Sequence, residues 1–404
     1  MVPKGWSSVQ AQDVCKSISV GVVIKPTQYY VPEGYGVKAF RSANVREGFI
    51  NDSDWVYFSH EGHAINKKSH LKTGDVLIVR TGYPGTACVV TPEFEGSNAI
   101  DIVIARPDMD EIIPEYLCAY TNSHIGKSQV LDLQGGMAQK HLNVGAYQVL
   151  KINLPPLREQ KKIAQILSTW DKAILVTEKL LANSQQQKKA LMQQLLTGKK
   201  RLLDENGVRF SGEWCTCTLS EVAHIIMGSS PKSEAYNDNG LGLPLIQGNA
   251  DIKCRVSCPR VYTSDITKEC TPGDILLSVR APVGTVALSQ HKACIGRGIS
   301  AIKSKKKMSQ SFLYQWFLWF EPKWCYLSQG STFESINSDD IKTLKLSVPN
   351  FEEQQKIAAV LSAADAEIST LEKKLACLRD EKKALMQQLL TGKRRVKVDE
   401  AVAE

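Results

Sequence analysis

The chain has 404 residues, of which 43% are hydrophobic and 23% are charged, which is the composition of a soluble globular protein. Its length predicts two or three domains. Lys and Arg outnumber Asp and Glu by 50 to 42, and the net charge of +8 is compatible with nucleic-acid binding without requiring it. The most apolar run, Phe312–Phe320, contains Gln315 and is too short to span a bilayer.

The cysteines and the start of the chain indicate the compartment. Residues 1–6 lead directly into mixed sequence, so no secretory leader is predicted. The eleven cysteines are odd in number and scattered, and a chain of this size needs no disulfides to fold. We therefore expect reduced thiols and a cytoplasmic protein.

In chain order, the sequence predicts two globular domains, each followed by a long helix. The first domain is expected to be of mixed character, with strand-like runs at Val76–Val79 and Ala99–Ile104 among Gly and Pro turns. The predicted segments are a first globular domain (1–153), a first long helix (154–200), a second globular domain (201–347), a second long helix (348–395) and a flexible tail (396–404).

The two helical segments repeat each other. Residues 188–199 and 382–393 both read KKALMQQLLTGK, and the register continues back to Glu159-Gln160 and Glu353-Gln354 without a gap. Proline before each segment and glycine after it are the expected helix boundaries. Each helix, running from the Glu-Gln pair to the Leu-Leu-Thr-Gly sequence, would be about 57 Å long.

Each copy carries a heptad seam of mostly apolar residues, which predicts that the two helices pair. The pairing residues are Ile163, Leu167, Ile174, Leu181, Leu191 and Leu195 in the first helix and Ile357, Leu361, Ile368, Leu375, Leu385 and Leu389 in the second. Lys188 and Lys382 interrupt the seam at the same place in both copies, and such a residue can fix register or partner orientation. The alternative is that each helix packs only on the core of its own domain.

The globular domains also repeat each other, but weakly. Gly74-Asp75 followed by VLIVR and a Gly-Thr pair resembles Gly273-Asp274 followed by ILLSVR and a Gly-Thr pair, with one extra residue before the second arginine. Asn143 and Asn337 share their spacing to the helices. Because most of the other sequence differs, the pattern is typical of a binding domain whose specificity lies on loops.

The motif P-x-[LF]-x-E-Q opens each helix and L-L-T-G-[KR] closes it, in a chain that alternates globular domain and long helix. This arrangement resembles the specificity subunit of type I restriction–modification systems over essentially the whole chain. The resemblance implies an α+β fold: two similar mixed α/β target recognition domains separated by two long helices, which pair as an antiparallel coiled coil with pseudo-twofold symmetry.

The resemblance also implies the function. Each domain would read one half of a split DNA site, and the helices would act as a spacer. Two methyltransferase (modification) subunits would be recruited, with two restriction subunits in the full enzyme. These partners would use S-adenosylmethionine, ATP and magnesium, so neither cofactor nor catalysis is expected in this chain. Because the two domains have diverged, the target should be non-palindromic, with half-sites one to two turns of DNA apart.

Candidate DNA-contacting residues are Lys, Arg and Tyr side chains near turns. They are Lys67, Lys68, Arg80, Tyr83 and Lys140 in the first domain and Arg255, Arg260, Arg280, Arg297, Lys303, Lys305, Lys306 and Lys307 in the second. Lysines favour phosphates, whereas arginines suit guanine edges. Arg80 and Arg280 both follow a Gly-Asp-x-Leu strand, and the alternative for them is a structural ion pair. For Lys305–Lys307 the alternative is a solvated charged face.

Catalytic and metal-binding patterns are weak. Gly126-Lys127-Ser128 lacks the earlier glycine of a phosphate loop, and neither Asp251-Ile252-Lys253 nor Asp340-Ile341-Lys342 has a convincing acidic partner upstream. No methyltransferase tetrapeptide of the Asn/Asp-Pro-Pro-Tyr/Phe type is present, and no metal site is predicted. Possible metal ligands are His60, His63 and His70, and a second set of cysteines, Cys215, Cys217, Cys254 and Cys258. The spacing of these cysteines is not the usual zinc pattern. The aromatic residues Trp316, Phe317, Trp319, Phe320 and Trp324 are expected in the core rather than stacked on bases.

Two other functions fit the same features. The first is the DNA-reading subunit of a combined restriction and methylation enzyme outside type I, which the neighbouring genes would reveal. The second is a coiled-coil scaffold that binds no DNA, which salt-dependent binding to random duplexes would distinguish.

Overall fold

The computed structural model describes residues 2–133, 141–324 and 335–398. The chain divides into two compact units, one made of Met1–Lys179 with Lys373–Glu404 and the other of Leu180–Glu372. Each unit therefore contains one globular domain together with a segment of each long helix.

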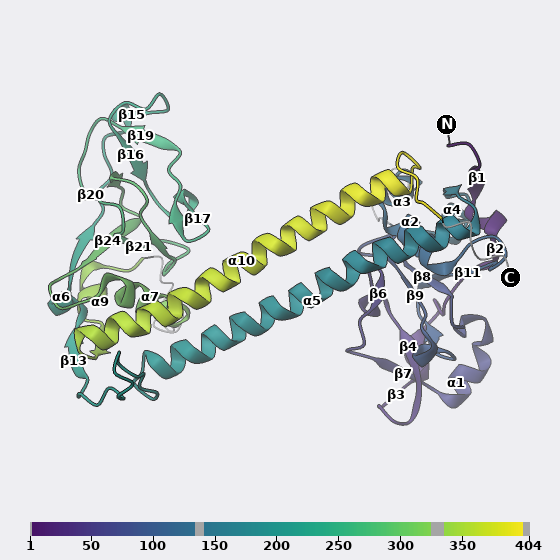
Figure 1. Cartoon of the computed structure of the whole chain (residues 1–404), viewed down its shortest axis with the longest axis horizontal. Helices are drawn as coiled ribbons and strands as arrows, with labels where there is room; N and C mark the ends of the chain where they lie inside the picture. The colour runs from purple at the N-terminus through teal and green to yellow at the C-terminus, as the bar shows by residue number, and fades with distance from the viewer. Residues whose placement is uncertain (1, 134–140, 325–334, 399–404) are drawn as a thin grey trace. The chain divides into compact units, whose positions relative to one another are not determined.

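The two longest elements are the helices α5 (Leu157–Leu195) and α10 (Phe351–Leu389), each of 39 residues (Figure 1). They occupy most of the helical segments that the sequence predicts. Beyond each helix, Gly198 and Gly392 adopt φ angles of 70° and 68°. This left-handed conformation favours glycine and commonly ends a helix, which explains the closing Thr-Gly pair.

Two four-stranded sheets form the first globular domain. The first sheet is β2 (Cys15–Val20), β11 (Ile102–Pro107), β8 (Val76–Val79) and β9 (Ala87–Val89) in spatial order, and the second is β10 (Asn98–Ala99), β4 (Gly36–Phe40), β7 (Val56–Ser59) and β3 (Tyr30–Val31). Two short pairs are β1 (Ser7–Gln10) with β12 (Lys151–Leu154) and β5 (Val45–Arg46) with β6 (Phe49–Ile50). The helices are α1 (His60–Ile65), α2 (Pro114–Asn122), α3 (His124–Asp132) and α4 (Val144–Gln148). The predicted strand Val76–Val79 is β8, and all four of its residues are buried.

The second globular domain has larger sheets. Its first sheet is β14 (Ala223–Met227), β24 (Ile299–Ser304), β21 (Ile275–Ser278), β22 (Val286–Leu288), β18 (Val256–Ser257) and β17 (Ile252–Lys253). Its second sheet is β15 (Tyr236–Asn237), β19 (Val261–Thr263), β16 (Leu243–Ile246), β23 (Ala293–Ile295) and β20 (Glu269–Cys270), and β13 (Cys215–Thr218) pairs with β25 (Lys345–Val348). The helices are α6 (Leu219–Val222), α7 (Gln310–Phe320) and α9 (Ser338–Lys342).

The two domains share one scaffold. The order β2–β11–β8–β9 is repeated as β14–β24–β21–β22, and the pair β1–β12 is repeated as β13–β25. Asn143 and Asn337 cap α4 and α9 through their side-chain oxygens, which explains their matched spacing in the sequence. The expected fold, with two similar mixed α/β domains joined by long helices, is therefore confirmed.

The ends of both long helices complete the core of each unit. In the first unit, Ile163 and Leu167 of α5 and Leu389 of α10 belong to the same buried cluster as Tyr116 of α2. In the second unit, Leu195 of α5 and Ile357 and Leu361 of α10 join the cluster around Phe312 of α7. The long helices thus pack on the domain cores, and they also pair with each other within each unit.

Within each unit the two helices run antiparallel. In the first unit Asp171 and then Glu178 of α5 meet Lys382 and then Arg379 of α10. In the second unit Ser184 and then Lys188 meet Glu367 and then Asp365. Each residue of the predicted apolar seam is buried or half-buried. Over the described residues, no helix combines the length and the apolar character that a membrane span requires.

Candidate nucleic-acid interface and helix junctions

Gln160 fixes the start of α5 to the first domain. Its side chain is 1% exposed, and its amide oxygen accepts a hydrogen bond of 3.0 Å from the backbone N–H of Ile113. Its amide nitrogen donates to the carbonyls of Glu111 and Pro155, both at 2.9 Å. The buried amide therefore satisfies three backbone groups, which is the arrangement that a buried polar side chain requires.

Gln354 repeats this arrangement at the start of α10. It accepts a hydrogen bond of 2.8 Å from the N–H of Ser309 and donates to the carbonyls of Lys307 and Pro349. The glutamine of the repeated Glu-Gln motif is thus an anchor between helix and domain in both units.

The preceding glutamate of the motif binds an arginine that follows the other long helix. Glu353 is fully buried and receives two hydrogen bonds, of 2.6 and 2.7 Å, from Arg201. Its carboxylate raises the pKa of Arg201 above its usual value. In the first unit, Arg395 makes the same fork with Glu159, which also accepts from the indole nitrogen of Trp6 at 3.2 Å. Glutamate and glutamine together explain why the motif occurs in both copies.

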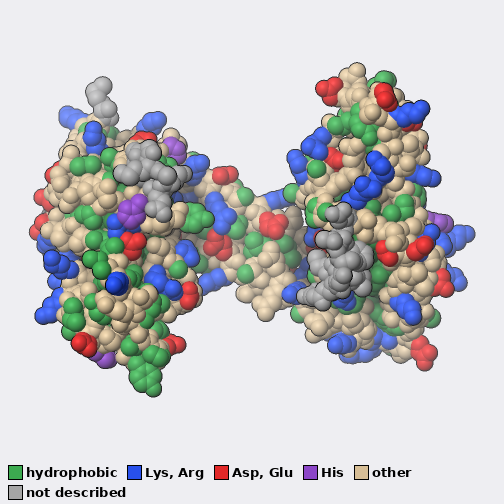
Figure 2. Space-filling view, turned by 180° about the vertical axis from the view of Figure 1, so that it is seen from behind, with side chains coloured by type: hydrophobic (Ala, Val, Ile, Leu, Met, Phe, Trp, Pro, Cys, Tyr) green, Lys and Arg blue, Asp and Glu red, His purple; other side chains and the backbone are tan. Residues whose placement is uncertain are grey.

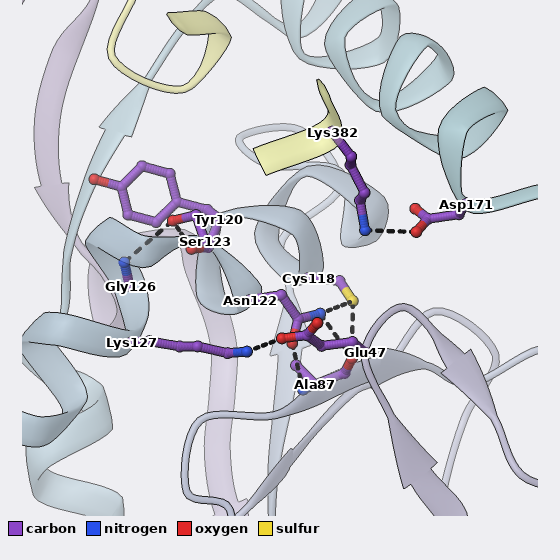
Figure 3. Close-up of polar contacts among 10 residues, drawn as sticks. All are labelled: Glu47, Ala87, Cys118, Tyr120, Asn122, Ser123, Gly126, Lys127, Asp171 and Lys382. Atoms are coloured by element: carbon purple, nitrogen blue, oxygen red, sulfur yellow. Dashed lines mark hydrogen bonds and ion pairs between the residues drawn. The ribbon is translucent and has the colours of Figure 1, made fainter. Parts of the chain in front are cut away.

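A lysine–aspartate pair lies farther along the helices in each unit. Lys382 donates to Asp171 at 2.5 Å, as Figure 3 shows, and Lys188 donates to Asp365. The lysine side chains are only 15% and 12% exposed. Because a slip of one residue would separate the charges, these pairs account for the two polar interruptions of the apolar seam.

Next to this pair, the first unit has a groove of about 980 Å³ between α3, the β5–β6 hairpin and the two long helices. Phe49, Ile174, Leu175 and Met386 supply apolar surface, and Phe49 is 45% exposed. The charged side chains at the groove include Lys172, Lys383, Arg379 and Glu178. No motif in the sequence indicates this groove, because its residues come from four separate segments.

Gly126-Lys127-Ser128 lies at one side of the groove and has a structural explanation. A side chain at Gly126 would bring its Cβ within 2.4 Å of the Tyr120 carbonyl oxygen, so the position requires glycine. The Gly126 N–H is bound by Ser123 at the start of α3, and Lys127 forms an ion pair with Glu47 (Figure 3). Burial, followed by the nearby charge of Lys382, lowers the pKa of Lys127.

The structure separates the DNA candidates of the first domain into interior and surface residues. Lys67 and Lys68 are exposed on a short 3-10 turn after α1, and Tyr83 is 84% exposed in the turn between β8 and β9. Lys140 lies outside the described residues. Arg80, in contrast, is only 9% exposed.

Arg80 forms the structural ion pair that was given above as the alternative to DNA contact. Its guanidinium donates to the Leu142 carbonyl at 3.0 Å and to Asp101 at 2.5 Å, and its remaining amino group contacts His141 Nε2. Since arginine only donates, that histidine nitrogen must accept, which leaves the proton on Nδ1 facing Thr81 Oγ at 3.0 Å. These partners use the hydrogen-bonding groups of Arg80 inside the domain.

Arg280 is not the counterpart of Arg80. Each domain has one isolated β-bridge beside this turn, and Arg280 occupies the place that Thr81 has in the first domain. Arg80 therefore corresponds to Val279. Val279 is buried, and the one extra residue before the second arginine moves that arginine one position later, into the exposed turn. Arg280 is accordingly exposed.

Among the other second-domain candidates, two arginines form ion pairs within the domain. Arg255 binds both oxygens of Glu321, and Arg260 binds Asp251 at 3.0 Å. Both of these arginines are nevertheless exposed, as are Arg297, Lys303, Lys306 and Lys307. Lys305 is half-buried and donates to the Ser220 carbonyl. On the face drawn in Figure 2, Lys and Arg side chains are scattered among Asp and Glu over both domains.

Three of the candidate metal ligands and catalytic residues, His63, His70 and Asp340, make structural contacts. The rings of His63 and His70 stack at 3.8 Å, and His63 contacts the side chain of Asn98 at 2.6 Å. Asp340 accepts from the N–H of Asn337 at 2.8 Å and so caps α9. Within the described ranges, no group of three or more His, Cys, Asp or Glu residues is placed to hold a metal ion.

The aromatic run of the second domain belongs to the core, as expected. Trp316, Phe317 and Trp324 are 2%, 0% and 4% exposed and lie in one buried cluster. Trp319 and Phe320 pack against the edge of that cluster.

The chain thus contains two copies of one scaffold, each joined to paired helices and each presenting different exposed side chains. Residues 3–183 and 211–378 match the family described as the type I restriction modification DNA specificity domain. The chain belongs to this family, as the sequence motifs indicated.

Two relatives from Methanocaldococcus jannaschii match over nearly their full length. A protein named as the putative type I restriction enzyme MjaX specificity subunit is 32% identical, with 98% of this chain and 95% of the relative covered. The type I restriction enzyme MjaVIII specificity subunit is 26% identical, with 98% and 94% covered.

Solved structures support the same assignment. One, reported for complex assembly and conformational transition of the type I restriction–modification system, is 26% identical with a TM-score of 0.60, and 98% of this chain and 100% of that chain are covered. The S subunit from M. genitalium has a TM-score of 0.63 at 14% identity, with 96% of both chains covered, and supports the fold alone.

Proposed function

We propose that this chain is the non-catalytic DNA-reading subunit of a type I restriction–modification complex. Each globular domain reads one half of a bipartite, non-palindromic site. The observation that carries this proposal is the comparison of the two domains, which keep one sheet order but present Tyr83 in one turn and Arg280 in the equivalent turn. Two unlike readers in one chain predict two unlike half-sites.

The long helices set the distance between the two half-sites in this proposal. A continuous helix of 39 residues extends about 58 Å at 1.5 Å per residue, which is between one and two turns of DNA. The lysine–aspartate pairs support a spacer of fixed length, because they specify the register of the two helices.

Recruitment of two methyltransferase subunits, and of two restriction subunits in the full enzyme, is the second part of the proposal. S-adenosylmethionine, ATP and magnesium would then be bound by those partners. For the methyltransferase subunit we propose the groove of the first unit as part of the docking surface. Phe49 and Leu175 expose apolar area there beside lysines of both helices, which suits an amphipathic acidic segment.

The proposal is tested by methylation mapping of genomic DNA in cells that express the chain with its methyltransferase partner. The expected result is one bipartite motif. Exchange of residues 1–150 for the corresponding domain of a relative should then change one half-site and leave the other and the spacing unchanged. A change of both halves would contradict the modular reading, and binding that shows no sequence preference would contradict the function itself.

A further inference from the structure

The turn between β8 and β9 is closed by backbone hydrogen bonds and exposes the ring of Tyr83. Gly82 and Gly85 have φ angles of 88° and 86°, which only glycine adopts without strain. The Gly85 N–H donates to the Val79 carbonyl at 3.0 Å, and the Thr86 N–H donates to the Tyr83 carbonyl at 3.2 Å. Tyr83, at the tip, is 84% exposed. A ring held this far out of the core contributes nothing visible to the fold.

The backbone under this turn is also fixed. Arg80 precedes the turn and is held by Asp101 and by His141, and His141 in turn contacts Thr81. A turn that is already ordered loses little conformational entropy when its tip binds a ligand. The buried arginine is therefore a positioning residue for the turn.

The equivalent turn of the second domain presents different chemistry. Ser278 Oγ lies 2.9 and 2.8 Å from the carbonyl oxygens of Arg280 and Pro282, and its single hydroxyl proton is shared between them, which holds the turn closed. A Cβ on Gly284 would lie 2.5 Å from the ring of Trp324, so the turn also packs tightly against the domain. Arg280 is exposed at the position that Thr81 has in the first domain.

We propose that these two turns are the base-reading elements of the two domains. Tyr83 contacts the methyl group of a thymine through its ring, and Arg280 donates two hydrogen bonds to O6 and N7 of a guanine, both in the major groove. Lys67, Lys68, Lys303 and Lys306, which are exposed cations elsewhere on the domains, contact phosphates. This inference rests on the proposed function, because it assigns bases to residues of the two readers.

The test uses the complex with the methyltransferase subunit and duplexes that carry the mapped site. Each thymine is replaced in turn by uracil, which lacks the methyl group, and each guanine by 7-deazaguanine, which lacks N7. For the unmodified chain we expect about a fourfold loss of affinity at one thymine of one half-site. At one guanine of the other half-site we expect about a 5- to 150-fold loss.

Protein variants then assign each effect to a residue. Tyr83→Ala should bind thymine and uracil duplexes equally, and Tyr83→Phe should keep the preference, because it keeps the ring. Arg280→Met removes every hydrogen-bond donor of the side chain and should lose the sensitivity to 7-deazaguanine, while the other sequence preferences of the complex stay unchanged. Tyr35→Ala is the matched control, because Tyr35 is 73% exposed on the first domain outside the turn.

Two failures can be distinguished. If the complex recognises a bipartite site but Tyr83→Ala and Arg280→Met keep every base preference, the assignment of the turns is wrong and the proposed function stands. If the unmodified complex shows no bipartite site, the proposed function itself is wrong. Both residues are exposed, so unchanged melting temperatures will show that the variants are folded.

Discussion

Replacing Gln160 by alanine should destabilise the first unit by more than the loss of one hydrogen bond, because the side-chain amide binds three backbone groups. The substitution removes the partner of the Ile113 N–H and the Glu111 carbonyl, which lie in partly buried hydrogen bonds, and of the Pro155 carbonyl, whose hydrogen bond is buried. A buried polar group that loses its hydrogen bond lowers the free energy of unfolding by about 1–3 kcal/mol. We expect a total of about 3 kcal/mol, since carbonyls tolerate the loss better than an N–H.

Differential scanning calorimetry and amide hydrogen exchange can measure this effect. For a unit of about 200 residues, a loss of about 3 kcal/mol corresponds to a decrease of about 6–12 °C in the melting temperature of that unit. The Ile113 amide should also lose its protection from exchange. Gln165→Ala is the matched control, because Gln165 is an exposed glutamine of the same helix. Equal melting temperatures for Gln160→Ala and Gln165→Ala would refute the anchor role of the motif.

Three further predictions concern the helix register, the groove and the cysteines. A double-mutant cycle with Lys382→Met and Asp171→Leu should give a coupling of about 1 kcal/mol in the free energy of unfolding, and a coupling near zero would mean that the pair does not stabilise the register. Phe49→Ser should weaken binding of the methyltransferase subunit by about tenfold in a titration, whereas the control Tyr35→Ser should not; equal affinities would exclude the groove from the interface. Burial raises the pKa of the Cys15 thiol to about 12, so its thiolate forms only as the pH approaches 12, and its alkylation should stay slow from pH 7 to pH 9 while exposed Cys215 reacts. Rapid labelling of Cys15 at pH 8 would contradict this burial.

The helices and their pairing could be predicted because their signals are local and occur twice. The heptad seam and the repeated peptide are periodic patterns, whereas β8 is indicated by a short apolar run between turns. The Lys–Asp pairs could also have been found. Asp171 and Asp365 occupy matched positions, as do Lys188 and Lys382, and antiparallel pairing of two copies brings each lysine opposite the aspartate of the other copy.

The surface residues could not be assigned in the same way. Phe49 and Leu175 line one groove although they lie in a hairpin and in a helix far along the chain, and no spacing rule relates them. The ion pair of Arg255 with Glu321 likewise joins segments far apart in the sequence, and that of Arg260 with Asp251 joins the residues on either side of the β17–β18 pair. Charge and turn propensity identify an arginine near a loop, but only the tertiary structure shows whether its partner is already inside the protein.

The two arginines after the Gly-Asp-x-Leu strands show how one extra residue changes the surface of a repeated scaffold. Arg80 lies directly after β8 and is buried, whereas one additional residue in the second domain places Arg280 one position later, in the exposed turn, and buried Val279 takes the position of Arg80. The interior contacts of the turn are then supplied by other groups, such as Ser278, while the scaffold keeps its strand order. A shift of one position therefore exchanges a buried positioning residue for an exposed arginine while the strand order is kept. Under the proposed function, this separation of scaffold from exposed tip would allow two similar domains in one chain to recognise different half-sites.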